Sequence, residues 1–281
     1  MRVAIFGLGY VGTVSAACLG RLGHRVTGVD LVEEKVALVR EGRSPVEEPQ
    51  IEELLREGVA AGRVRATTDG ARAVAETDMA WIAVGTPSGP NGGLDHSQVE
   101  RTVDGIGEAL RGSTRPYGLV IRSTLLPGST RDLLMPLLES ASGRRVGDGL
   151  EVGFHPEFLR EGASVDDFFD PPLLVAGTPS DGLFDALSGL YEGVDGRMAR
   201  VAIEEAELLK YVCNAWHALK VVFGNEVGRL ARALSVDAHR VMAAFCRDEK
   251  LNISSRYLRP GFAYGGSCLP KDLRALVHLA R

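Results

Sequence analysis

Residues 3–12, Val-Ala-Ile-Phe-Gly-Leu-Gly-Tyr-Val-Gly, determine how the first part of this chain is organised. The apolar run 3–6 is typical of a buried strand, and the glycines that follow have the spacing GxGxxG. Gly7 would permit a tight turn, Gly9 would let a pyrophosphate approach the backbone, and Gly12 would let a helix pack closely on the strand. The amide groups at the start of that helix would face the phosphates, so the stretch predicts a dinucleotide site.

An acidic residue supports this interpretation and indicates which dinucleotide binds. Asp30 follows a second expected strand, residues 25–29, at the distance where a carboxylate receives a ribose 2′-hydroxyl. The same carboxylate would repel a 2′-phosphate, which favours NAD over NADP. Lys35 would reach the adenosine edge, although an exposed helical lysine is the alternative. For the glycines, the alternative is a strand–turn–helix that merely tolerates them.

The alternation of strands and helices continues. Apolar strands are expected at 63–67, 80–84, 119–121, 152–154 and 173–175, and helices at 33–41, 51–59, 69–76, 97–110 and near 183–191. This pattern predicts an α/β fold, a Rossmann-type doubly wound parallel sheet. Thr86 and Thr124 follow two of the strands and would line the crevice at their carboxyl ends, unless they are ordinary caps.

A Pro-containing loop follows the strand at 152–154 and reads His-Pro-Glu-Phe-Leu-Arg-Glu-Gly, residues 155–162. Glu157 and Glu161 are four residues apart, so on a helical turn they would share one face. Their mutual repulsion would raise the pKa of one of them, which suits a general base. Plain surface charge is the alternative.

From residue 203 to about 234 the chain has no proline, which predicts one long helix. Lys210, Asn214, His217 and Asn225 form a polar stripe on an otherwise apolar helix, which we expect to be buried with the stripe facing a ligand or another element. Gly224 and Gly228 would admit a second helix, for example across a dimer. We therefore expect a dinucleotide domain at 1–202 and an all-α domain built on this helix at 203–281.

The sequence Gly-Gly-Ser-Cys-Leu-Pro-Lys-Asp, residues 265–272, precedes another helical pattern. Cys268 would sit at the start of that helix, where the macrodipole favours the thiolate, and Lys271 would act in the same direction. A buried, inert cysteine is the alternative. An NAD domain combined with a nucleophilic thiol fits oxidation of an alcohol to a carboxylate, because an aldehyde trapped as a thiohemiacetal can be oxidised again to a thioester.

Composition excludes several other classes of function. The net charge of −5 gives no basic footprint for nucleic acid, and no apolar run is long enough to cross a bilayer. The four cysteines lack metal-site spacing and are typical of reduced cytosolic thiols, so no metal is expected. No signal-peptide pattern opens the sequence, and we expect a cytoplasmic protein.

Six motifs together resemble the nucleotide-sugar 6-dehydrogenases, the family of UDP-glucose and GDP-mannose dehydrogenases. They are FGLGYVG at residue 6, VGTP at 84, RST at 122, HPEFLREG at 155, LLKYVCNAWH at 208 and GFAYGGSCLPKD at 261. The last two favour the GDP-mannose branch. His155 is a departure, since the family usually has asparagine there. Family members continue into a third, nucleotide-covering domain, whereas this sequence stops inside a helix.

The resemblance implies a role for each matching residue. Cys268 would be the nucleophile, Glu157 would orient or deprotonate the hydrolytic water, and Lys210, Asn214 and Asp272 would stabilise oxyanions. The residues that would hold NAD are Gly7, Gly9, Tyr10, Val11, Gly12, Asp30, Lys35, Thr86, Thr124 and Lys271. The residues that would bind the sugar nucleotide are Glu161, Lys210, Asn214, His217, Asn225, Tyr257, Arg259, Phe262 and Gly265.

The implied activity is oxidation of GDP-mannose to GDP-mannuronate with two NAD⁺, as a step toward an alginate-like polysaccharide. The resemblance also implies a homodimer through the long helix, with Arg259 reaching into the partner subunit. UDP-glucose oxidation is one alternative, and an inactive NAD-binding fragment without the third domain is another. A simple 2-hydroxyacid or 6-phosphogluconate-type dehydrogenase would share the first domain but has no use for Cys268.

Overall fold

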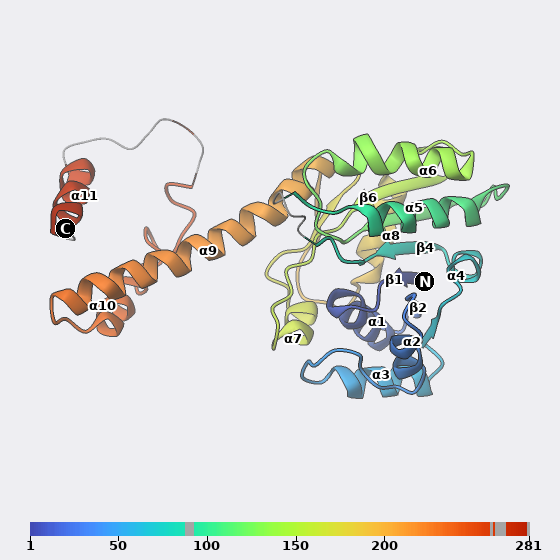
Figure 1. Cartoon of the computed structure of the whole chain (residues 1–281), viewed down its shortest axis with the longest axis horizontal. Coiled ribbons are helices and arrows are strands. Elements are labelled where there is room, and N and C mark those ends of the chain that lie inside the picture. Colours follow the sequence, from blue (N-terminus) through green and yellow to red (C-terminus); the bar gives the residue numbers. More distant parts are fainter. Residues whose placement is uncertain (88–92, 259–260, 262–267, 280–281) are drawn as a thin grey trace. The chain divides into compact units, whose positions relative to one another are not determined.

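The computed structural model describes residues 1–87, 93–258, 261 and 268–279 (Figure 1). It divides into two compact units, Met1–Val212 and Cys213–Arg281. The first unit contains a sheet covered by helices, and the second is helical.

The first unit is built on one eight-stranded sheet with the order β3-β2-β1-β4-β5-β6-β7-β8. The strands are β1 (Arg2–Phe6), β2 (Arg25–Val29), β3 (Val64–Thr67), β4 (Met79–Ile82), β5 (Tyr117–Ile121), β6 (Leu150–Phe154), β7 (Val175–Gly177) and β8 (Ala199–Val201). Strands β1 to β6 are parallel, and the order reverses at β1, which is the doubly wound arrangement that the sequence predicted.

The last two strands depart from a fully parallel sheet. Strand β7 runs antiparallel to β6, with Gly177 opposite Phe154, and β8 runs parallel to β7. The expectation of a parallel sheet is therefore wrong for these two strands. An apolar strand pattern carries no information about direction, so this reversal could not be predicted from it.

Helices cover both faces of the sheet because successive side chains of each strand point to opposite sides. The helices of the first unit are α1 (Tyr10–Arg21), α2 (Glu33–Arg40), α3 (Ile51–Ala60), α4 (Gly70–Glu76), α5 (Ser97–Leu110), α6 (Met135–Ser142), α7 (Ser164–Phe169) and α8 (Asp181–Leu190), with a π-helix, η1 (Thr130–Leu134), before α6. Val3 and Ile5 of β1 belong to one buried cluster, and Ala4 and Phe6 belong to the other.

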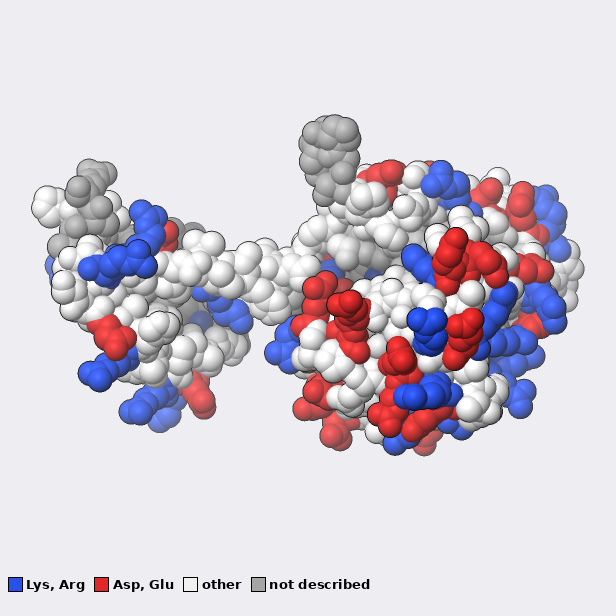
Figure 2. All heavy atoms as spheres, turned by 60° about the horizontal axis from the view of Figure 1, so that its bottom comes forward, with Lys and Arg blue, Asp and Glu red and all other residues white. Residues whose placement is uncertain are grey.

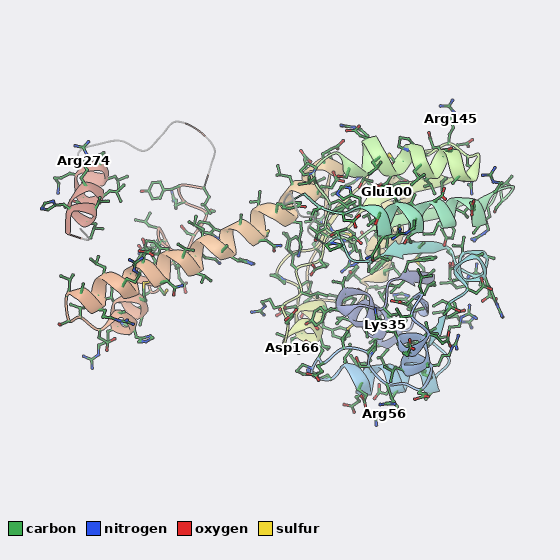
Figure 3. The ribbon with its side chains drawn as sticks, in the orientation of Figure 1. Lys35, Arg56, Glu100, Arg145, Asp166 and Arg274 are labelled. Atoms are coloured by element: carbon green, nitrogen blue, oxygen red, sulfur yellow. The ribbon has the colours of Figure 1, made fainter. Side chains whose placement is uncertain are left out.

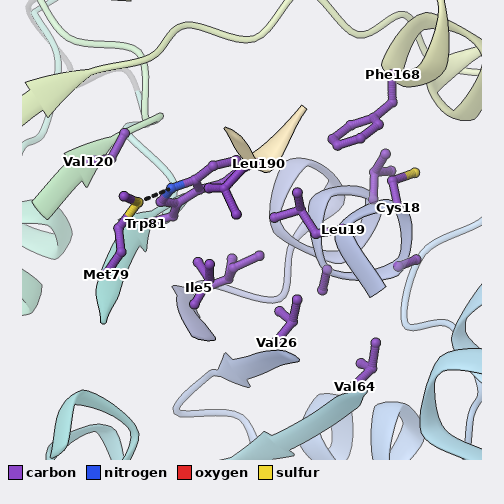
Figure 4. Close-up of a cluster of buried hydrophobic side chains, with 14 of the residues drawn as sticks. Ile5, Cys18, Leu19, Val26, Val64, Met79, Trp81, Val120, Phe168 and Leu190 are labelled. Carbon is purple, nitrogen blue, oxygen red and sulfur yellow. Dashed lines mark hydrogen bonds between the residues drawn. The ribbon is translucent and has the colours of Figure 1, made fainter. Parts of the chain in front are cut away.

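The first cluster lies between the sheet and helices α1, α2, α3, α7 and α8 (Figure 4). Trp81 of β4 is fully buried there, and its indole Nε1 donates to the Met79 sulfur at 3.1 Å. The second cluster packs the opposite face against α4, α5, α6 and the start of α9 (Ile203–Ala233). The fold thereby buries both faces of the strands and leaves their ends open for loops.

The second unit contains the rest of α9, then α10 (Ala238–Phe245) and α11 (Cys268–Leu279). The rings of Phe223 and Phe245 lie 5.7 Å apart where α9 and α10 meet. Our expectation that α9 is buried around most of its circumference is wrong for this chain: Leu219 is 56% and Val222 is 55% exposed. Helix α10 has eight residues and covers only part of the apolar surface of α9. Among the described helices, none combines the length and apolarity that a membrane span requires.

Candidate functional site

The turn between β1 and α1 needs two of its glycines and leaves room at the third. Gly7 has a φ of +99°, and a Cβ there would lie 2.7 Å from the carbonyl oxygen of Ala83. A Cβ on Gly12 would overlap the carbonyl oxygen of Gly7. At Gly9, in contrast, a Cβ would meet nothing within 4 Å. The backbone at Gly9 therefore borders empty space that a ligand group can enter.

The start of α1 is suited to an anion. Its N-cap, Gly9, has no side chain to accept from the first amide groups, and the first turn, with Tyr10 and Val11, contains no acidic residue. The amide groups of a helix's first turn lack carbonyl partners within the helix and carry the positive end of its dipole. Together with the space at Gly9, this arrangement fits the pyrophosphate of a dinucleotide.

Asp30 is fixed at the carboxyl end of β2. Its Oδ2 accepts from the amide of Leu8 at 2.7 Å, and its Oδ1 accepts from the amide of Val32 at 3.0 Å. Lys35 of α2 (labelled in Figure 3) donates to Oδ2 at 3.5 Å. A carboxylate oxygen has more than one lone pair, so Asp30 can still accept from a ribose hydroxyl.

Thr86 and Thr124 lie side by side at the carboxyl ends of β4 and β5. The hydroxyl of Thr86 donates to the carbonyl oxygen of Thr124 at 3.0 Å. The loop after Thr124 is held by Glu207 of α9, which is fully buried and accepts from the amides of Gly128 at 2.6 Å and Thr130 at 2.9 Å. Sequence reasoning brought the two threonines together but missed Glu207.

A nearly buried ion pair lies in the loop that follows β6. The Lys210 Nζ is 2.7 Å from Oε1 of Glu157 and also donates to the Glu157 carbonyl oxygen at 2.8 Å. The two side chains are 10% and 12% exposed. The other oxygen of Glu157 accepts from the amide of Leu159 at 2.8 Å. The pair thus places a cation and a carboxylate at one point on the ligand-binding edge of the sheet.

Our prediction that Glu157 and Glu161 share a helical turn is wrong, because residues 155–160 form no helix. Carboxylates take the amide hydrogens that a helix would use: Asp167 accepts from Arg160, and Glu48 accepts from Gly162 and Ser164. Glu161 is exposed, and Glu157 is paired with a lysine. The expected repulsion between the two glutamates therefore does not describe this loop.

His155 anchors the start of the same loop in a buried polar chain. Its Nδ1 donates to the Val175 carbonyl oxygen at 2.6 Å, and its Nε2 accepts from the Tyr191 hydroxyl at 2.7 Å. That hydroxyl accepts in turn from Arg122 Nη1 at 3.2 Å, and the Arg122 guanidinium stacks 4.7 Å from the ring centroid of Trp81. Burial, followed by the nearby Arg122 charge, holds the pKa of His155 well below its usual value. The imidazole is therefore neutral, and it replaces the expected asparagine with a two-ended hydrogen bond.

The remaining predicted residues lie on the second unit or outside the described residues. Asn214, His217 and Asn225 are exposed on α9, Tyr257 is 87% exposed, and Asp272 pairs with Lys271 on α11. Cys268 is the first described residue of α11, which agrees with the expected helix, and the residues just before it lie outside the described ones, so its place at the helix start stays a prediction. Arg259, Phe262 and Gly265 lie outside the described residues. No cluster of three His, Cys, Asp or Glu side chains within the described ranges could hold a metal.

Fold and site together define an NAD-type dinucleotide-binding protein. Residues 1–195 match the NAD binding domain of the UDP-glucose/GDP-mannose dehydrogenase family, and residues 204–281 match its central domain. The chain belongs to that family. It therefore carries an NAD-binding domain, as the glycines and Asp30 indicated.

Similar proteins of known name support the same family assignment. The chain is 48% identical over 280 residues to a GDP-mannose 6-dehydrogenase of Pseudomonas putida, covering 100% of this chain and 64% of the relative. It is 38% identical over 286 residues to a UDP-glucose 6-dehydrogenase of Haloferax volcanii, covering 100% of this chain and 66% of the relative. The chain thus spans somewhat under two thirds of the length of the GDP-mannose enzymes that it matches.

Among solved structures, a ternary complex of GDP-mannose dehydrogenase from Pseudomonas aeruginosa superposes with a TM-score of 0.98 at 47% identity, covering 100% of this chain and 64% of that one. A UDP-glucose dehydrogenase from Pyrobaculum islandicum superposes with a TM-score of 0.84 at 38% identity, covering 99% of this chain and 63% of that one.

Proposed function

We propose that the protein oxidises the C6 hydroxymethyl group of a nucleotide sugar to a carboxylate, using two NAD⁺. The observation that carries this proposal is the Glu157–Lys210 pair, which stands at the ligand-binding edge of a sheet whose first turn is shaped for a dinucleotide. Simple binding of NAD requires no such pair, whereas oxidation of an alcohol and hydrolysis of an acyl intermediate both require proton transfer.

The chemistry balances with the residues assigned. One alcohol, one water and two NAD⁺ give one carboxylate, two NADH and three protons. NAD⁺, held at the turn of Gly7, Gly9 and Gly12 with Asp30, would supply the hydride acceptor for each oxidation. Cys268 adds to the aldehyde as a thiohemiacetal, which is oxidised to a thioester, and water then displaces the thiolate. Glu157 orients or deprotonates that water, and the Lys210 ammonium, with Asn214 and Asp272, stabilises the oxyanions.

The preferred substrate in this proposal is GDP-mannose, with GDP-mannuronate as the product. Support comes from the higher identity to relatives named GDP-mannose 6-dehydrogenase, 48% against 38% for a relative named UDP-glucose 6-dehydrogenase. UDP-glucose is the alternative substrate. Because the chain spans 64% of those relatives, an NAD-binding fragment without turnover is the alternative of another class.

The remaining assignments belong to the same proposal. The dinucleotide domain ends at residue 202 and the helical domain follows, in keeping with family matches that end at 195 and begin at 204. Two copies pair through α9, whose exposed apolar residues include Leu219 and Val222; much of the second unit's surface in Figure 2 is uncharged. We place the enzyme in the cytoplasm and its product in the synthesis of an alginate-like polymer.

The test is NADH formation by the purified chain with GDP-mannose and, in parallel, with UDP-glucose. We expect turnover with GDP-mannose and two NADH per sugar. Cys268→Ser should abolish carboxylate formation, whereas Cys246→Ser, at an exposed cysteine after α10, should leave it unchanged. Faster turnover of UDP-glucose would reassign the substrate. NAD⁺ binding without turnover of either sugar would favour the fragment, and full activity of Cys268→Ser would refute the covalent route.

A further inference from the structure

Glu48 connects two loops that the proposed function treats separately. It lies between α2 and α3, in a segment flanked by Pro45 and Pro49. Its Oε2 accepts from the Tyr10 hydroxyl at 2.7 Å and from the amide of Gly162 at 2.9 Å. Its Oε1 accepts from the amide of Ser164 at 2.8 Å. One carboxylate therefore bridges the glycine turn of α1 and the loop that carries Glu157.

The bridge has contacts on both sides of Glu48. The Tyr10 hydroxyl also lies 3.2 Å from the carbonyl oxygen of Arg160, so Tyr10 touches the same loop directly. Gln50 donates to Asp166 of α7 (labelled in Figure 3) at 3.4 Å. Residues 48–50 thus contact the chain between residues 160 and 166 at several points. Among these hydrogen bonds, those of Glu48 are the shortest.

The bridge depends on the ionised carboxylate. The Tyr10 hydroxyl and the amides of Gly162 and Ser164 all donate hydrogen bonds to Glu48. A glutamine at this position would direct its own NH₂ group toward at least one of these donors, and that hydrogen bond would be lost. Burial opposes ionisation, but hydrogen bonds from Tyr10, Gly162 and Ser164 lower the pKa of Glu48. The carboxylate is therefore charged at neutral pH, and hydrogen bonds to a charged acceptor are stronger than neutral ones.

Two ion pairs also hold the loop on the far side of the bridge. Arg160 pairs with Asp167 of α7 at 2.6 Å, which ties the end of the loop to that helix. Glu157 lies three residues before Arg160 and is held by Lys210. The Tyr10 hydroxyl contacts the Arg160 carbonyl, so a shift of Tyr10 would reach Glu157 through the short stretch of chain that joins Arg160 to Glu157.

We propose that Glu48 is a positioning residue that couples the dinucleotide turn to the Glu157 loop, so that NAD⁺ binding and the geometry of the Glu157–Lys210 pair favour each other. Only the effect of this coupling on catalysis rests on the proposed function. The mechanical link between Tyr10 and residues 160–164 would exist in an NAD-binding fragment as well. By reciprocity, weakening the link must weaken NAD⁺ binding as much as it weakens the ordering of the loop by NAD⁺.

The experiment compares Glu48→Gln with Glu47→Gln, a matched change at the exposed neighbouring residue. NAD⁺ affinity is measured by titration, and hydrogen exchange of the amides of residues 159–164 is measured with and without NAD⁺. In the unsubstituted protein and in Glu47→Gln, NAD⁺ should slow exchange in this segment. In Glu48→Gln, NAD⁺ affinity should fall about tenfold, and the NAD⁺-dependent slowing should disappear.

A second variant keeps the proposal testable if Glu48→Gln does not fold. Tyr10→Phe retains the ring and the two amide bonds to Glu48 but removes the hydroxyl contacts with Glu48 and the Arg160 carbonyl, so the slowing of exchange by NAD⁺ should be lost. Unchanged NAD⁺ affinity and unchanged NAD⁺-dependent exchange in these variants would overturn the proposal. Absent turnover with nucleotide sugars, alongside normal coupling, would overturn only the proposed function.

Discussion

Replacing His155 with asparagine should destabilise the first unit and also change how its stability depends on pH. His155 is 1% exposed and bridges the Val175 carbonyl and the Tyr191 hydroxyl from opposite sides of its ring. Asparagine is shorter and can keep only one of the two bonds. Tyr191, 7% exposed, would then lack an acceptor for its hydroxyl hydrogen.

The magnitude follows from those two losses. A buried donor left without an acceptor costs about 2 kcal/mol, and a residual cavity of about 40 Å³ where the ring was costs about 1 kcal/mol. The total of about 3 kcal/mol should lower Tm by about 6–12 °C in a domain of this size. The measurement is thermal unfolding at pH 8, followed by circular dichroism and by tryptophan fluorescence, to which Trp81 contributes; its ring centroid lies 5.7 Å from that of the imidazole.

The pH dependence follows from the lowered pKa of His155. Below about pH 6.5 the unfolded chain binds a proton that the native imidazole does not, so stability falls by about 1.4 kcal/mol per pH unit until the native pKa is reached. His155→Asn has no imidazole at this position and so does not lose stability by this route. The stability gap between the two proteins should therefore narrow as the pH is lowered from 7 to 5.

The control is His239→Asn, at an exposed histidine of α10, which should change neither Tm nor its pH dependence. Equal slopes of stability against pH in the unsubstituted protein and His155→Asn would refute the neutral, buried imidazole. A variant as stable as the unsubstituted protein at pH 8 would refute the two-ended hydrogen bond.

Three further predictions concern the dinucleotide turn and the ion pair. Gly9→Ala should fold with an unchanged Tm, since its Cβ enters open space, but should bind NAD⁺ about thirtyfold more weakly because that space is where the ligand would enter. Gly12→Ala, whose Cβ would overlap the carbonyl oxygen of Gly7, should instead lower the Tm in thermal unfolding. Asp30→Ser should weaken NAD⁺ binding about tenfold and raise the ratio of NADP⁺ to NAD⁺ affinity; an unchanged ratio in titrations would contradict the role assigned to this carboxylate. Lys210→Met should cost about 3 kcal/mol by leaving Glu157 unpaired, and adding Glu157→Gln should recover part of that cost in a double-mutant cycle.

Local patterns were sufficient to predict most of the fold. The boundaries predicted for β2 and α5, 25–29 and 97–110, match the structure because each has a clear apolar period and a clear stop. The glycine turn was also predictable, since Gly7 and Gly12 are required by their own backbone surroundings. The two segment boundaries and the constraint at Gly12 depend on neighbours within a few residues, whereas the constraint at Gly7 also involves the distant Ala83.

The parts that were missed depend on distant residues. The loop after β6 is shaped by Glu48, which is more than 100 residues earlier in the chain, and by Tyr191 beyond β7. A glutamate between two prolines and a tyrosine at the end of a helix gave no signal of these contacts. The exposure of α9 was mispredicted for a related reason, because helical periodicity indicates which side is apolar but not what covers it.

The reversed direction of β7 and β8 determines the direction in which the first turns of α9 run along the sheet. A helix that follows a strand of a parallel sheet normally runs back toward the rim where the strands begin. Here Ile203 starts beside Gly177, level with Phe154, and the helix advances in the same sense as β1 to β6. From Ile203 to Lys210, seven residues of helix rise about 10 Å. From Phe154 to Glu157, three residues of extended chain span about the same distance. Because β7 and β8 are reversed, α9 brings the Lys210 ammonium level with the Glu157 carboxylate. If β7 and β8 ran parallel to β6, α9 would place Lys210 at the opposite edge of the sheet.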